Sequence, residues 1–412
     1  MRVIVIGGGA VGLCAAEALV ARGCEVTVLE RDRCGAGASA GNAGWITPSL
    51  AAPVPGPGVI ATSLRWLVDP SGPLWIRPAL SPALLHWIAQ FVLNCRRPAY
   101  ARGLAALQLA AAPAGRAFDA LADRGVEFER HHEPLLFPAF DRAELDMLTG
   151  AINDLQRARS SQRLELVSAG EMRGLEPALA PGVRGGMVAH GEGRVRPERL
   201  TAGLKSALVA RGAQVIEGIP VTRLTRHNGE WLAETPIGPH RAQTVVIASG
   251  VDSARLLAGH GLRLPIAAAK GYSRTYALDP SGPQQPLYLE GPKVAISVYE
   301  EGVRVSGTLE LGAQSLSLSA RRLQAITAAA QKALPGWQMP PEPRDWAGMR
   351  SLSPDGMPYI GPVPGPPGLH LATAHATLGI TLAPLTGELL AAMLLDGARD
   401  ELTSAFNPAR AI

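Results

Sequence analysis

The sequence predicts an α/β protein, α+β overall, in which a discontinuous nucleotide-binding domain carries an inserted domain built on an antiparallel sheet. Three observations predict this fold. A strand, a glycine turn, a helix and a second strand fill the first 30 residues, short buried strands recur near 214 and 244, and residues 264–310 alternate between apolar and polar. Buried strands joined by helices indicate a parallel sheet, whereas alternation indicates an antiparallel sheet with one packed face.

The first strand, 2–6, runs into a helix-period segment, 10–22, through a GGGAVG turn that begins at Gly7. This order is typical of a Rossmann-like domain. Gly7 makes the tight turn, Gly9 lets the backbone approach a pyrophosphate, and Gly12 lets the helix pack closely on the strand. The helix N-terminus offers free N–H groups to phosphates.

The second strand, 25–29, ends in Glu30, which is placed to accept hydrogen bonds from ribose hydroxyls. A run of small residues, 34–44, follows and can wrap closely around a flat ligand because it lacks bulky side chains.

A Pro-rich connection, 48–57, leads into an aromatic set made of Trp66, Trp75, Trp87 and Phe91. The set is partly at helical spacing, which is typical of a helical core. It also fits a lid, a docking face or a membrane-surface patch.

The later elements follow in order. We expect helices broken near Gly125 over 99–164, a strand near 185–188, a helix ending at 211, strands at 214–216 and 244–250, a helix at 320–334, a strand at 368–375 and a last helix through 395. This order predicts a nucleotide-binding domain made of 1–48, 186–255 and 338–412, and a substrate-binding domain made of 49–185 and 256–337.

The bulk composition is that of a packed protein of two domains: 412 residues, 47% hydrophobic and 18% charged. The net charge of +4 is too small to indicate nucleic-acid binding. The four cysteines show no CxxC pairing, so no metal site is expected and a reducing compartment fits. The apolar opening is the first strand rather than a secretion signal, and no apolar run could span a membrane. We expect a cytoplasmic protein, with peripheral contact at the inner face of the cell membrane as an alternative.

Five blocks resemble the FAD-dependent D-amino-acid oxidase superfamily, and most closely its bacterial D-amino-acid dehydrogenase branch. They are Gly7 to Glu30; Asn42-Ala43-Gly44 with Pro48 and Ala51-Ala52-Pro53; Lys270-Gly271-Tyr272-Ser273; Gly348-Met349-Arg350 with Pro354 to Gly361; and His375 to Gly387. The first and fourth are shared across the superfamily, whereas the Asn-Ala-Gly and Lys-Gly-Tyr-Ser blocks favour the dehydrogenase branch.

The resemblance implies FAD as the cofactor. The residues it places at the FAD are Gly7, Gly9, Ala10, Val11, Gly12, Glu30, Arg31, Ser39, Asn42, Ala43, Gly44, Val221, Ser249, Gly250, Arg350, His375, Leu378, Gly379, Ile380 and Thr381. Some members attach the flavin through Cys or His. No cysteine follows Cys95 and no histidine lies in 35–50, so non-covalent binding is expected.

The turn at 379–381 would face the flavin pyrimidine edge, where N–H groups stabilise the negative charge of the reduced ring. His375 lies nearby and fits either structural support or a flavin-site role. The next residue is Ala376, where family members usually have glycine, so a close flavin contact is less well supported there.

On the substrate side, the resemblance implies that Arg350 binds the substrate carboxylate, since a guanidinium forms two parallel hydrogen bonds to that group. A structural ion pair is the alternative. Family members usually have Pro after this Arg, where this chain has Ser351. Tyr288 and Tyr272 are candidates to add a hydroxyl at the carboxylate or over the ring, and each is equally suited to a core.

The chemistry implied is transfer of the Cα hydrogen as hydride to flavin N5, followed by hydrolysis of the imine to a 2-oxo acid and ammonia. The partner is then a small amino or imino acid. The strand near 303–309 offers Arg304 and no lysine to activate oxygen, which favours a quinone or another electron carrier as acceptor.

Three hypotheses remain. The first is a D-amino-acid dehydrogenase, the second an enzyme for D-proline, D-hydroxyproline, sarcosine or glycine, and the third a flavoprotein subunit that is inactive alone.

Overall fold

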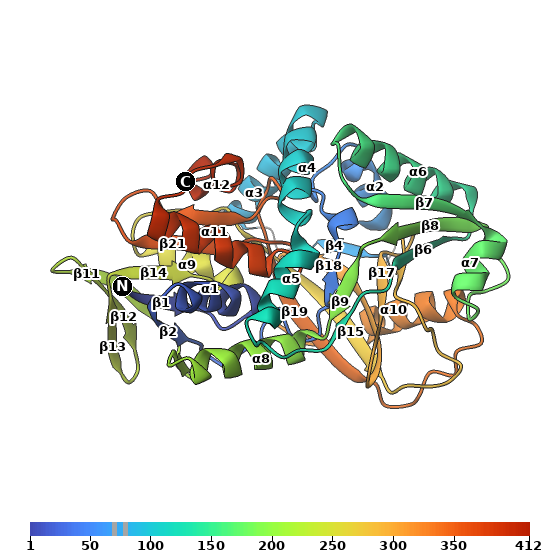
Figure 1. Cartoon of the computed structure of the whole chain (residues 1–412). Coiled ribbons are helices and arrows are strands. Elements are labelled where there is room, and N and C mark those ends of the chain that lie inside the picture. Colours follow the sequence, from blue (N-terminus) through green and yellow to red (C-terminus); the bar gives the residue numbers. More distant parts are fainter. Residues whose placement is uncertain (68–71, 77–80) are drawn as a thin grey trace.

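The computed structural model describes residues 1–67, 72–76 and 81–412. Two sheet-centred halves lie side by side, with both chain ends in the half that holds the parallel sheet (Figure 1). The predicted fold class is confirmed.

The nucleotide half is centred on a six-stranded sheet. Its strands in spatial order are β10 (Gln214–Ile216), β2 (Glu25–Leu29), β1 (Arg2–Ile6), β14 (Thr244–Ile247), β21 (Leu369–Thr373) and β20 (Tyr359–Pro362). All neighbours pair in parallel except β20 with β21. The parallel strands therefore end at one edge of the sheet, where a nucleotide is expected to bind.

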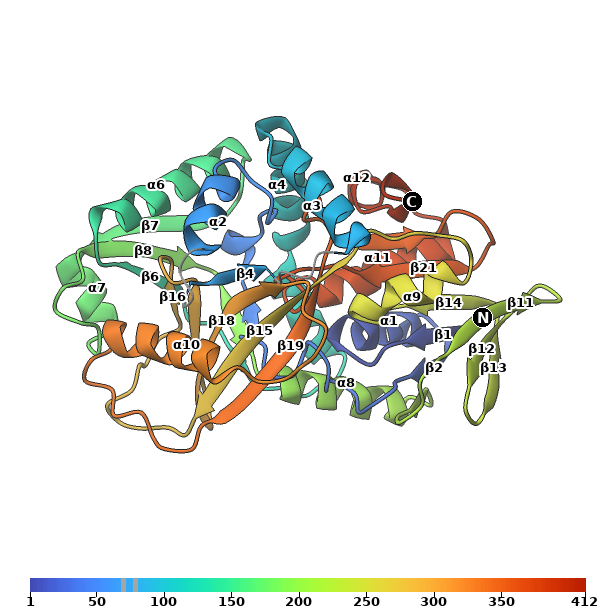
Figure 2. The same ribbon diagram turned by 180° about the vertical axis from the view of Figure 1, so that it is seen from behind.

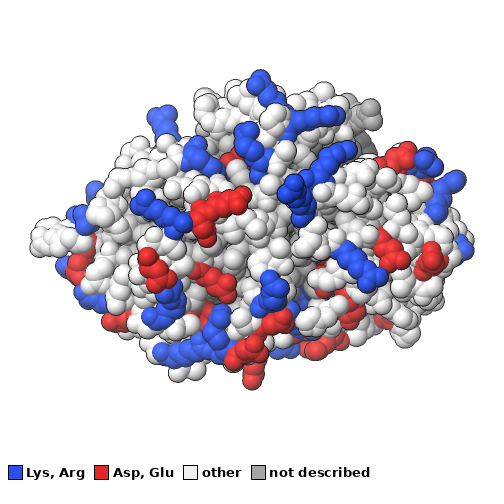
Figure 3. Space-filling view, turned by 45° about the horizontal axis from the view of Figure 1, so that its top comes forward, with Lys and Arg blue, Asp and Glu red and all other residues white. Residues whose placement is uncertain are grey.

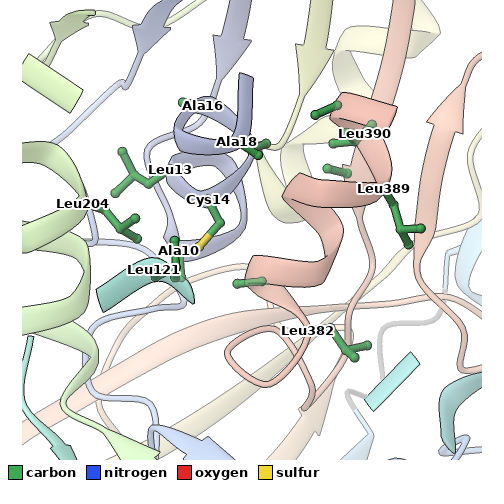
Figure 4. Packing of buried hydrophobic residues seen from close by; sticks show 14 of the residues in the cluster. Ala10, Leu13, Cys14, Ala16, Ala18, Leu121, Leu204, Leu382, Leu389 and Leu390 are labelled. Carbon is green, nitrogen blue, oxygen red and sulfur yellow. The ribbon is translucent and has the colours of Figure 1, made fainter. Parts of the chain in front are cut away.

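Three helices cover one face of this sheet: α1 (Ala10–Ala21), α8 (Pro197–Ala210) and α11 (Ala383–Asp396). Figure 4 shows Cys14 and Ala18 of α1 facing α11, and Leu13 facing Leu204 of α8. A Cβ added at Gly387 would lie 2.4 Å from the Cys14 carbonyl oxygen. Glycine at that position lets the two helices approach closely, which holds α11 against the sheet.

The other face of the sheet carries a second core around the buried Trp231. The elements there are β11 (Arg223–His227), β12 (Glu230–Thr235), β13 (Gly238–Ala242) and α9 (Ser253–Ala258).

The substrate half is centred on a nine-stranded sheet. Its strands in spatial order are β19 (Arg344–Leu352), β15 (Ala267–Tyr276), β18 (Gly302–Leu311), β17 (Val294–Tyr299), β16 (Leu287–Leu289), β6 (Leu135–Ala139), β8 (Gly185–His190) and β7 (Arg163–Ser168), with β4 (Leu74–Ile76) paired to β18. The antiparallel pairing predicted for 264–310 is present.

Helix α10 (Ala320–Ala333) packs across the outer face of this sheet, as Figure 2 shows from behind. Its apolar side chains meet Val303 and Val305 of β18 in one core. The opposite face of the same strands is turned toward the nucleotide half.

Two strands of this sheet come from segments predicted to belong to the nucleotide domain. Strand β8 pairs with β6 and β7, and β19 pairs with β15. The pairing places 185–190 and 344–352 in the substrate half, because strand partners and not sequence position decide which sheet a strand joins. The domain boundaries otherwise stay a prediction.

A small sheet of β3 (Trp45–Ile46), β9 (Gly193–Val195) and β5 (Arg130–His131) lies between the halves. The remaining helices are α2 (Val59–Leu67), α3 (Pro82–Asn94), α4 (Arg97–Ala111), α5 (Ala114–Asp123), α6 (Arg142–Arg157), α7 (Ala169–Leu175) and α12 (Glu401–Ala405), with short 3-10 turns at Pro48–Leu50, Gly250–Asp252 and Pro408–Arg410.

The aromatic set divides between these elements. Trp66 lies in α2, Trp75 on β4, and Trp87 and Phe91 in α3. Trp87 is buried, stacks on Phe91 at 5.2 Å between ring centroids, and donates from Nε1 to the Leu352 carbonyl. The core interpretation therefore holds for Trp87.

The same two helices also expose Leu64, Leu85 and Leu93, each at half its surface or more. A lid or docking role for these helices stays a prediction.

The surface shows positive and negative side chains interspersed over the face drawn in Figure 3. Within the described ranges, no helix is long and apolar enough to cross a membrane.

Candidate functional site

The turn between β1 and α1 has the geometry a pyrophosphate site requires. Gly7 has φ +113°, and a Cβ there would lie 2.5 Å from the Ala248 carbonyl oxygen. A Cβ at Gly12 would lie 2.0 Å from the Gly7 carbonyl oxygen, so helix and turn are packed as tightly as glycine allows. Gly9 is open by comparison, since its nearest such neighbour is Ser39 Oγ at 3.4 Å.

The first turn of α1 leaves backbone donors available. Ala10 N–H donates to Ser39 Oγ at 3.0 Å. No acceptor in the described part of the chain lies at the N–H groups of Val11 and Gly12. Free donors at a helix N-terminus favour an anion, so these residues fit the phosphates of FAD.

Glu30 lies at the end of β2, beside this turn. Its carboxylate accepts from Gly8 N–H at 2.6 Å and from Asp32 N–H at 2.9 Å. These bonds fix the carboxylate and leave each oxygen a further lone pair for a ribose hydroxyl. Arg31 instead pairs with Asp252 at 2.7 Å and Asp32 at 3.1 Å on the surface, so its side chain is committed to those carboxylates.

Three further residues expected at the FAD follow β10 and β14. Ser249 Oγ lies 3.2 Å from Ser253 Oγ, and the Gly250 carbonyl accepts from Thr373 Oγ1 at 2.8 Å. Val221 is buried, and its carbonyl accepts from Arg255 at 3.2 Å. The parallel strands bring these positions to the same edge of the sheet as Glu30.

The segment 41–45 crosses from the nucleotide half to the substrate sheet. Asn42 Oδ1 accepts from Gly44 N–H at 2.8 Å, which closes a tight turn. Gly44 has φ +72°, and a Cβ there would lie 2.0 Å from the Val195 carbonyl oxygen. The Ala43 carbonyl accepts from Ser297 Oγ at 2.8 Å and Tyr299 OH at 2.5 Å. The small residues in this run therefore allow close backbone contact with a neighbouring element.

The turn before α11 is also tied to this segment. Thr381 is buried; its hydroxyl donates to the Trp45 carbonyl at 2.9 Å and accepts from Thr47 N–H at 3.2 Å. The helix itself begins at Ala383, so Gly379, Ile380 and Thr381 form the turn that leads into it. The two segments predicted to border the flavin are thus side by side.

His375 lies at the base of this turn, where its carbonyl accepts from Leu378 N–H at 2.8 Å. Its Nε2 lies 2.9 Å from Thr386 Oγ1, whose hydroxyl donates to the Leu382 carbonyl. Burial lowers the pKa of His375 to about 3, so the imidazole is neutral. Hydrogen bonding within the fold favours structural support for His375.

Ala376 has φ +51°, in the left-handed region that favours glycine. The backbone conformation explains why glycine suits this position. Ser351 holds the same turn, since its carbonyl accepts from Ala376 N–H at 3.0 Å and its Oγ from Ala374 N–H at 3.2 Å.

Arg350 lies on β19, on the face turned toward the nucleotide half. Its Nη1 donates to the Thr308 carbonyl at 2.9 Å, and no carboxylate in the described ranges pairs with it. Burial lowers the pKa of Arg350 from its ordinary value. Arg350 is half-buried, has one hydrogen bond within the described chain and has no carboxylate partner there, so it is suited to bind an anionic ligand. The ion pair considered as the alternative is not found among the described residues.

Glycine 271 makes room for that guanidinium. A Cβ added at Gly271 would lie 2.2–2.4 Å from the guanidinium atoms of Arg350. Thr308, which accepts from Arg350, has φ +67°, an outlier for a β-branched residue. Sequence reasoning assigned neither residue, although Gly271 stands in the quoted Lys-Gly-Tyr-Ser block.

Tyr288 lies on β16 on the same face. Its ring meets Trp45 and Phe137 edge-on, each at 5.7 Å between centroids. Burial raises the pKa of Tyr288 well above its usual value, Glu290 raises it further, and the nearby charge of Arg350 lowers it in part. Tyr288 is therefore a neutral hydroxyl close to Arg350. Sequence reasoning missed Trp45, which its position next to Gly44 could have indicated.

Tyr272 is placed elsewhere. Its neighbour Gly271 faces Arg350, and successive strand residues point to opposite faces. Tyr272 accordingly packs under α10, where its hydroxyl donates to Glu310 at 2.5 Å. This position corrects the expectation that Tyr272 adds a hydroxyl at the carboxylate. Its role is that of a core aromatic.

Comparison with known proteins identifies relatives over the whole chain. A family model described as FAD dependent oxidoreductase matches residues 2–393. A D-amino acid dehydrogenase from Xanthobacter autotrophicus is 33% identical, over 100% of this chain and 99% of the relative. One from Methylobacterium nodulans is 32% identical, over 96% of this chain and 95% of the relative.

Solved structures agree with the fold. Glycine oxidase from Geobacillus kaustophilus superposes with a TM-score of 0.76 at 25% identity, covering 100% of this chain and 99% of that one. Iminodiacetate oxidase from Chelativorans superposes with a TM-score of 0.75 at 22% identity over 99% of both chains.

Proposed function

The chain belongs to the family of FAD-dependent oxidoreductases, and from that premise we propose that it oxidises D-amino acids to 2-oxo acids and ammonia. FAD is the cofactor, and we propose that it binds non-covalently. The observation that carries the proposal is Arg350, a half-buried arginine without a carboxylate partner among the described residues, on the sheet face turned toward the nucleotide half. The relatives named D-amino acid dehydrogenase support the substrate class.

When bound, FAD supplies the hydride acceptor for the Cα hydrogen. Arg350 has one N–H donor committed to Thr308, which leaves donors for both oxygens of a substrate carboxylate. Fixing the carboxylate orients Cα, and positioning of this kind supplies much of the rate enhancement in such a site. Tyr288, whose ring packs edge-on against Trp45, lies close enough to Arg350 to feel its charge. If the amine arrives neutral, the proposed reaction needs no protein base near Arg350 to deprotonate it.

We propose that electrons leave to a quinone or another carrier more readily than to oxygen. Arg304 occupies the strand position where an oxygen-activating lysine was considered. Its guanidinium is buried and committed to Asn42, Thr275 and Glu198 at 2.7–3.0 Å. A cation held in three bonds is poorly placed to serve oxygen, which supports the dehydrogenase hypothesis.

Glycine oxidation is the second candidate. The glycine oxidase structure is 25% identical over the full length of this chain, and glycine shares the carboxylate and primary amine that the site would bind. Activity with glycine and none with larger D-amino acids would favour this candidate.

The test is anaerobic reduction of the purified FAD-loaded protein, followed as bleaching of the flavin at about 450 nm. We expect D-amino acids to bleach it, with slow recovery in air and fast recovery with a soluble quinone. Bleaching by L-amino acids alone would contradict the proposal that the substrate is a D-amino acid. Bleaching only by proline or N-methyl amines would favour the imino-acid hypothesis, and no bleaching at all would favour a subunit that is inactive alone.

Arg350→Ala should lower kcat/KM by about a thousandfold, since it removes a charged pair of hydrogen bonds. Arg350→Lys keeps the charge without the planar fork and should lose less. Neither variant should change the FAD spectrum, and Arg350→Ala should not destabilise the protein because it removes a half-buried charge that has no carboxylate partner among the described residues. Wild-type efficiency in Arg350→Ala would contradict its role as the substrate anchor.

A further inference from the structure

Strand β18 forms a β-bulge against β15 at the point where both strands pass the guanidinium of Arg350. The regular pairs on either side of the bulge are Lys270 with Glu310 and Tyr272 with Gly307. Between these pairs, Gly271 of β15 stands opposite two residues of β18, Thr308 and Leu309. A bulge of this kind bends its strand and re-aims the groups at the extra position, and bulges are common next to active sites.

The bulge aims a backbone carbonyl at Arg350. Thr308 has φ +67°, a conformation that strains a β-branched residue. Its carbonyl accepts from Arg350 Nη1 at 2.9 Å, and the guanidinium lies over Gly271. The outer edge of the bulge is fixed by β4, because Leu309 N–H donates to the Pro73 carbonyl at 2.7 Å. Since Arg350 forms one hydrogen bond within the described chain, the direction of the Thr308 carbonyl decides where the guanidinium lies.

Three side chains span the bulge on the opposite face of the sheet, which α10 covers (Figure 2). Glu310 Oε2 accepts from the Tyr272 hydroxyl at 2.5 Å and lies 2.9 Å from Lys270 Nζ. All three residues are buried, and hydrogen bonds to an ionised group are strong ones. We call Lys270, Tyr272 and Glu310 the bulge clamp. A single carboxylate thus ties both neighbours of Gly271 to the strand that carries Thr308.

We propose that the bulge clamp positions Arg350 for the substrate carboxylate by fixing the Thr308 carbonyl from the far face of the sheet. This inference rests on the proposed function and names the residues that place its carboxylate anchor. The clamp residues do not touch the ligand, so they are positioning residues. Backbone strain of the kind found at Thr308 persists only where the surrounding structure enforces it. Loss of one clamp bond should let the carbonyl turn, and the guanidinium should move with it.

Tyr276 provides a matched comparison within the same strand. It lies on the same face of β15 as Tyr272, is equally part of the core under α10, and its hydroxyl lies 2.9 Å from Thr327 Oγ1 of that helix. The pairing of β15 with β18 is regular there, since Tyr276 pairs directly with Val303. The two tyrosines therefore differ in whether the hydroxyl spans the bulge.

The test compares Tyr272→Phe and Tyr276→Phe with the wild type, all FAD-loaded, with D-alanine as substrate and a soluble quinone as acceptor. Tyr272→Phe should raise KM by about fivefold and leave kcat within about twofold, because a misplaced anchor weakens the binding of substrate and transition state alike. Tyr276→Phe should leave KM unchanged. Each variant loses one buried hydroxyl, so both should lower the melting temperature by a similar amount.

A double variant checks that the effect passes through Arg350. Tyr272→Phe added to Arg350→Ala should not lower kcat/KM any further, because the clamp acts on the substrate only through the guanidinium. Independent effects would instead multiply, and the double variant would lose about another fivefold.

A lower melting temperature with wild-type KM in Tyr272→Phe would overturn the inference, because the clamp would then support the core alone. An equal rise of KM in Tyr276→Phe, or multiplied losses in the double variant, would also overturn it. Wild-type protein that no amino acid reduces would overturn the proposed function and this inference together. Wild-type reduction with unchanged kinetics in Tyr272→Phe would overturn this inference alone.

Discussion

At the scale of single residues, buried ionisable groups carry most of the functional signal. Arg350 is charged and half-buried, and no carboxylate of the described chain neutralises it, a state that costs stability unless a ligand supplies the anion. Other buried ionisable groups avoid the free-energy cost of an unpaired charge by staying neutral. They give the protein a definite dependence of stability on pH.

Two histidines should make the protein sensitive to acid. Burial lowers the pKa of His375 to about 3 and that of His370 to about 4. Below pH 6.5 the unfolded chain binds protons that the folded chain refuses, so stability is full above that pH and falls toward pH 4, by about 1.4 kcal/mol per pH unit for each histidine. Urea unfolding between pH 7 and 5 should show this slope. His370→Gln should roughly halve it, and His227→Gln, at an exposed position on β11, should not change it. An unchanged slope in His370→Gln would refute the assignment.

Glu192 should make the folded protein less stable as the pH rises. Its Oε1 accepts from Ser49 N–H at 3.0 Å, its Oε2 has no partner in the described chain, and burial raises its pKa to about 8. The folded chain therefore holds a proton that the unfolded chain releases above about pH 4.3. Stability from this group is present below that pH and lost as the pH rises to 8. Glu192→Gln should be more stable than wild type, by a margin that grows from pH 5 to 8. A margin independent of pH would contradict this.

At the scale of elements, strand β15 divides its residues between two functions. Gly271 and Ser273 face the proposed site, while Tyr272 packs under α10 with its hydroxyl on Glu310. Alternation along the strand therefore separates residues on the Arg350 face from a core residue within three consecutive positions.

Gly271→Ala should weaken substrate binding while leaving the stability of the protein nearly unchanged. The new Cβ would lie within 2.2–2.4 Å of the guanidinium of Arg350, which is the flexible end of a long side chain. We expect the guanidinium to move aside, so the melting temperature changes little while KM for a D-amino acid rises about tenfold or more. Gly150→Ala is the control, because Gly150 is exposed in α6 with no atom near its added Cβ. It should stabilise the helix by about 0.5–1 kcal/mol and leave KM unchanged. A wild-type KM in Gly271→Ala would mean that Arg350 does not bind the substrate.

At the scale of the whole molecule, Arg304 links the two halves. Its fully buried guanidinium, on β18 of the substrate sheet, donates to the Asn42 carbonyl at 2.7 Å and to Glu198 of α8 at 2.7 Å. Both partners belong to the nucleotide half. The substrate sheet is thus fastened to the segment that we propose borders the FAD.

Arg304→Gln should weaken this link. Removal of a buried cation leaves Glu198 and the Asn42 carbonyl under-satisfied, at a cost of about 3 kcal/mol. We expect a lower melting temperature and a smaller FAD content in the purified protein, partly restored by excess FAD because the ligand stabilises the folded state. Arg344→Ala is the control, since Arg344 contacts the same Glu198 at 3.4 Å but is 64% exposed. Its effect should be within about 0.5 kcal/mol, and an equal loss in both variants would contradict the link.

Much of the nucleotide half could be predicted from the sequence. The strands 2–6, 25–29 and 214–216 match β1, β2 and β10, and in the substrate half α10 matches the predicted helix within one residue. These elements depend on local pattern and on turn chemistry, which the sequence displays directly. The roles of Gly7 and Gly12 could also be predicted from the glycine motif. The structure explains that motif, because only glycine tolerates the contacts found at these two positions.

The substrate half was harder to predict, because the local sequence pattern does not show which strands pair or which face a side chain takes. Residues 186–190 of β8 were assigned to the nucleotide-binding domain and Tyr272 to the substrate carboxylate, because strand partners and facing layers are set by packing across distant segments that local pattern does not display.

By itself, then, the sequence determined that the chain begins with a nucleotide-binding βαβ unit and contains an antiparallel sheet whose residues alternate between apolar and polar. It also showed the resemblance to FAD-dependent enzymes. Only the tertiary structure decided that Arg350 lacks a carboxylate partner among the described residues and that Gly271 leaves room for its guanidinium. The physical reason is that charge neutralisation and hydrogen-bond satisfaction are properties of an environment, and strands from across the chain build that environment.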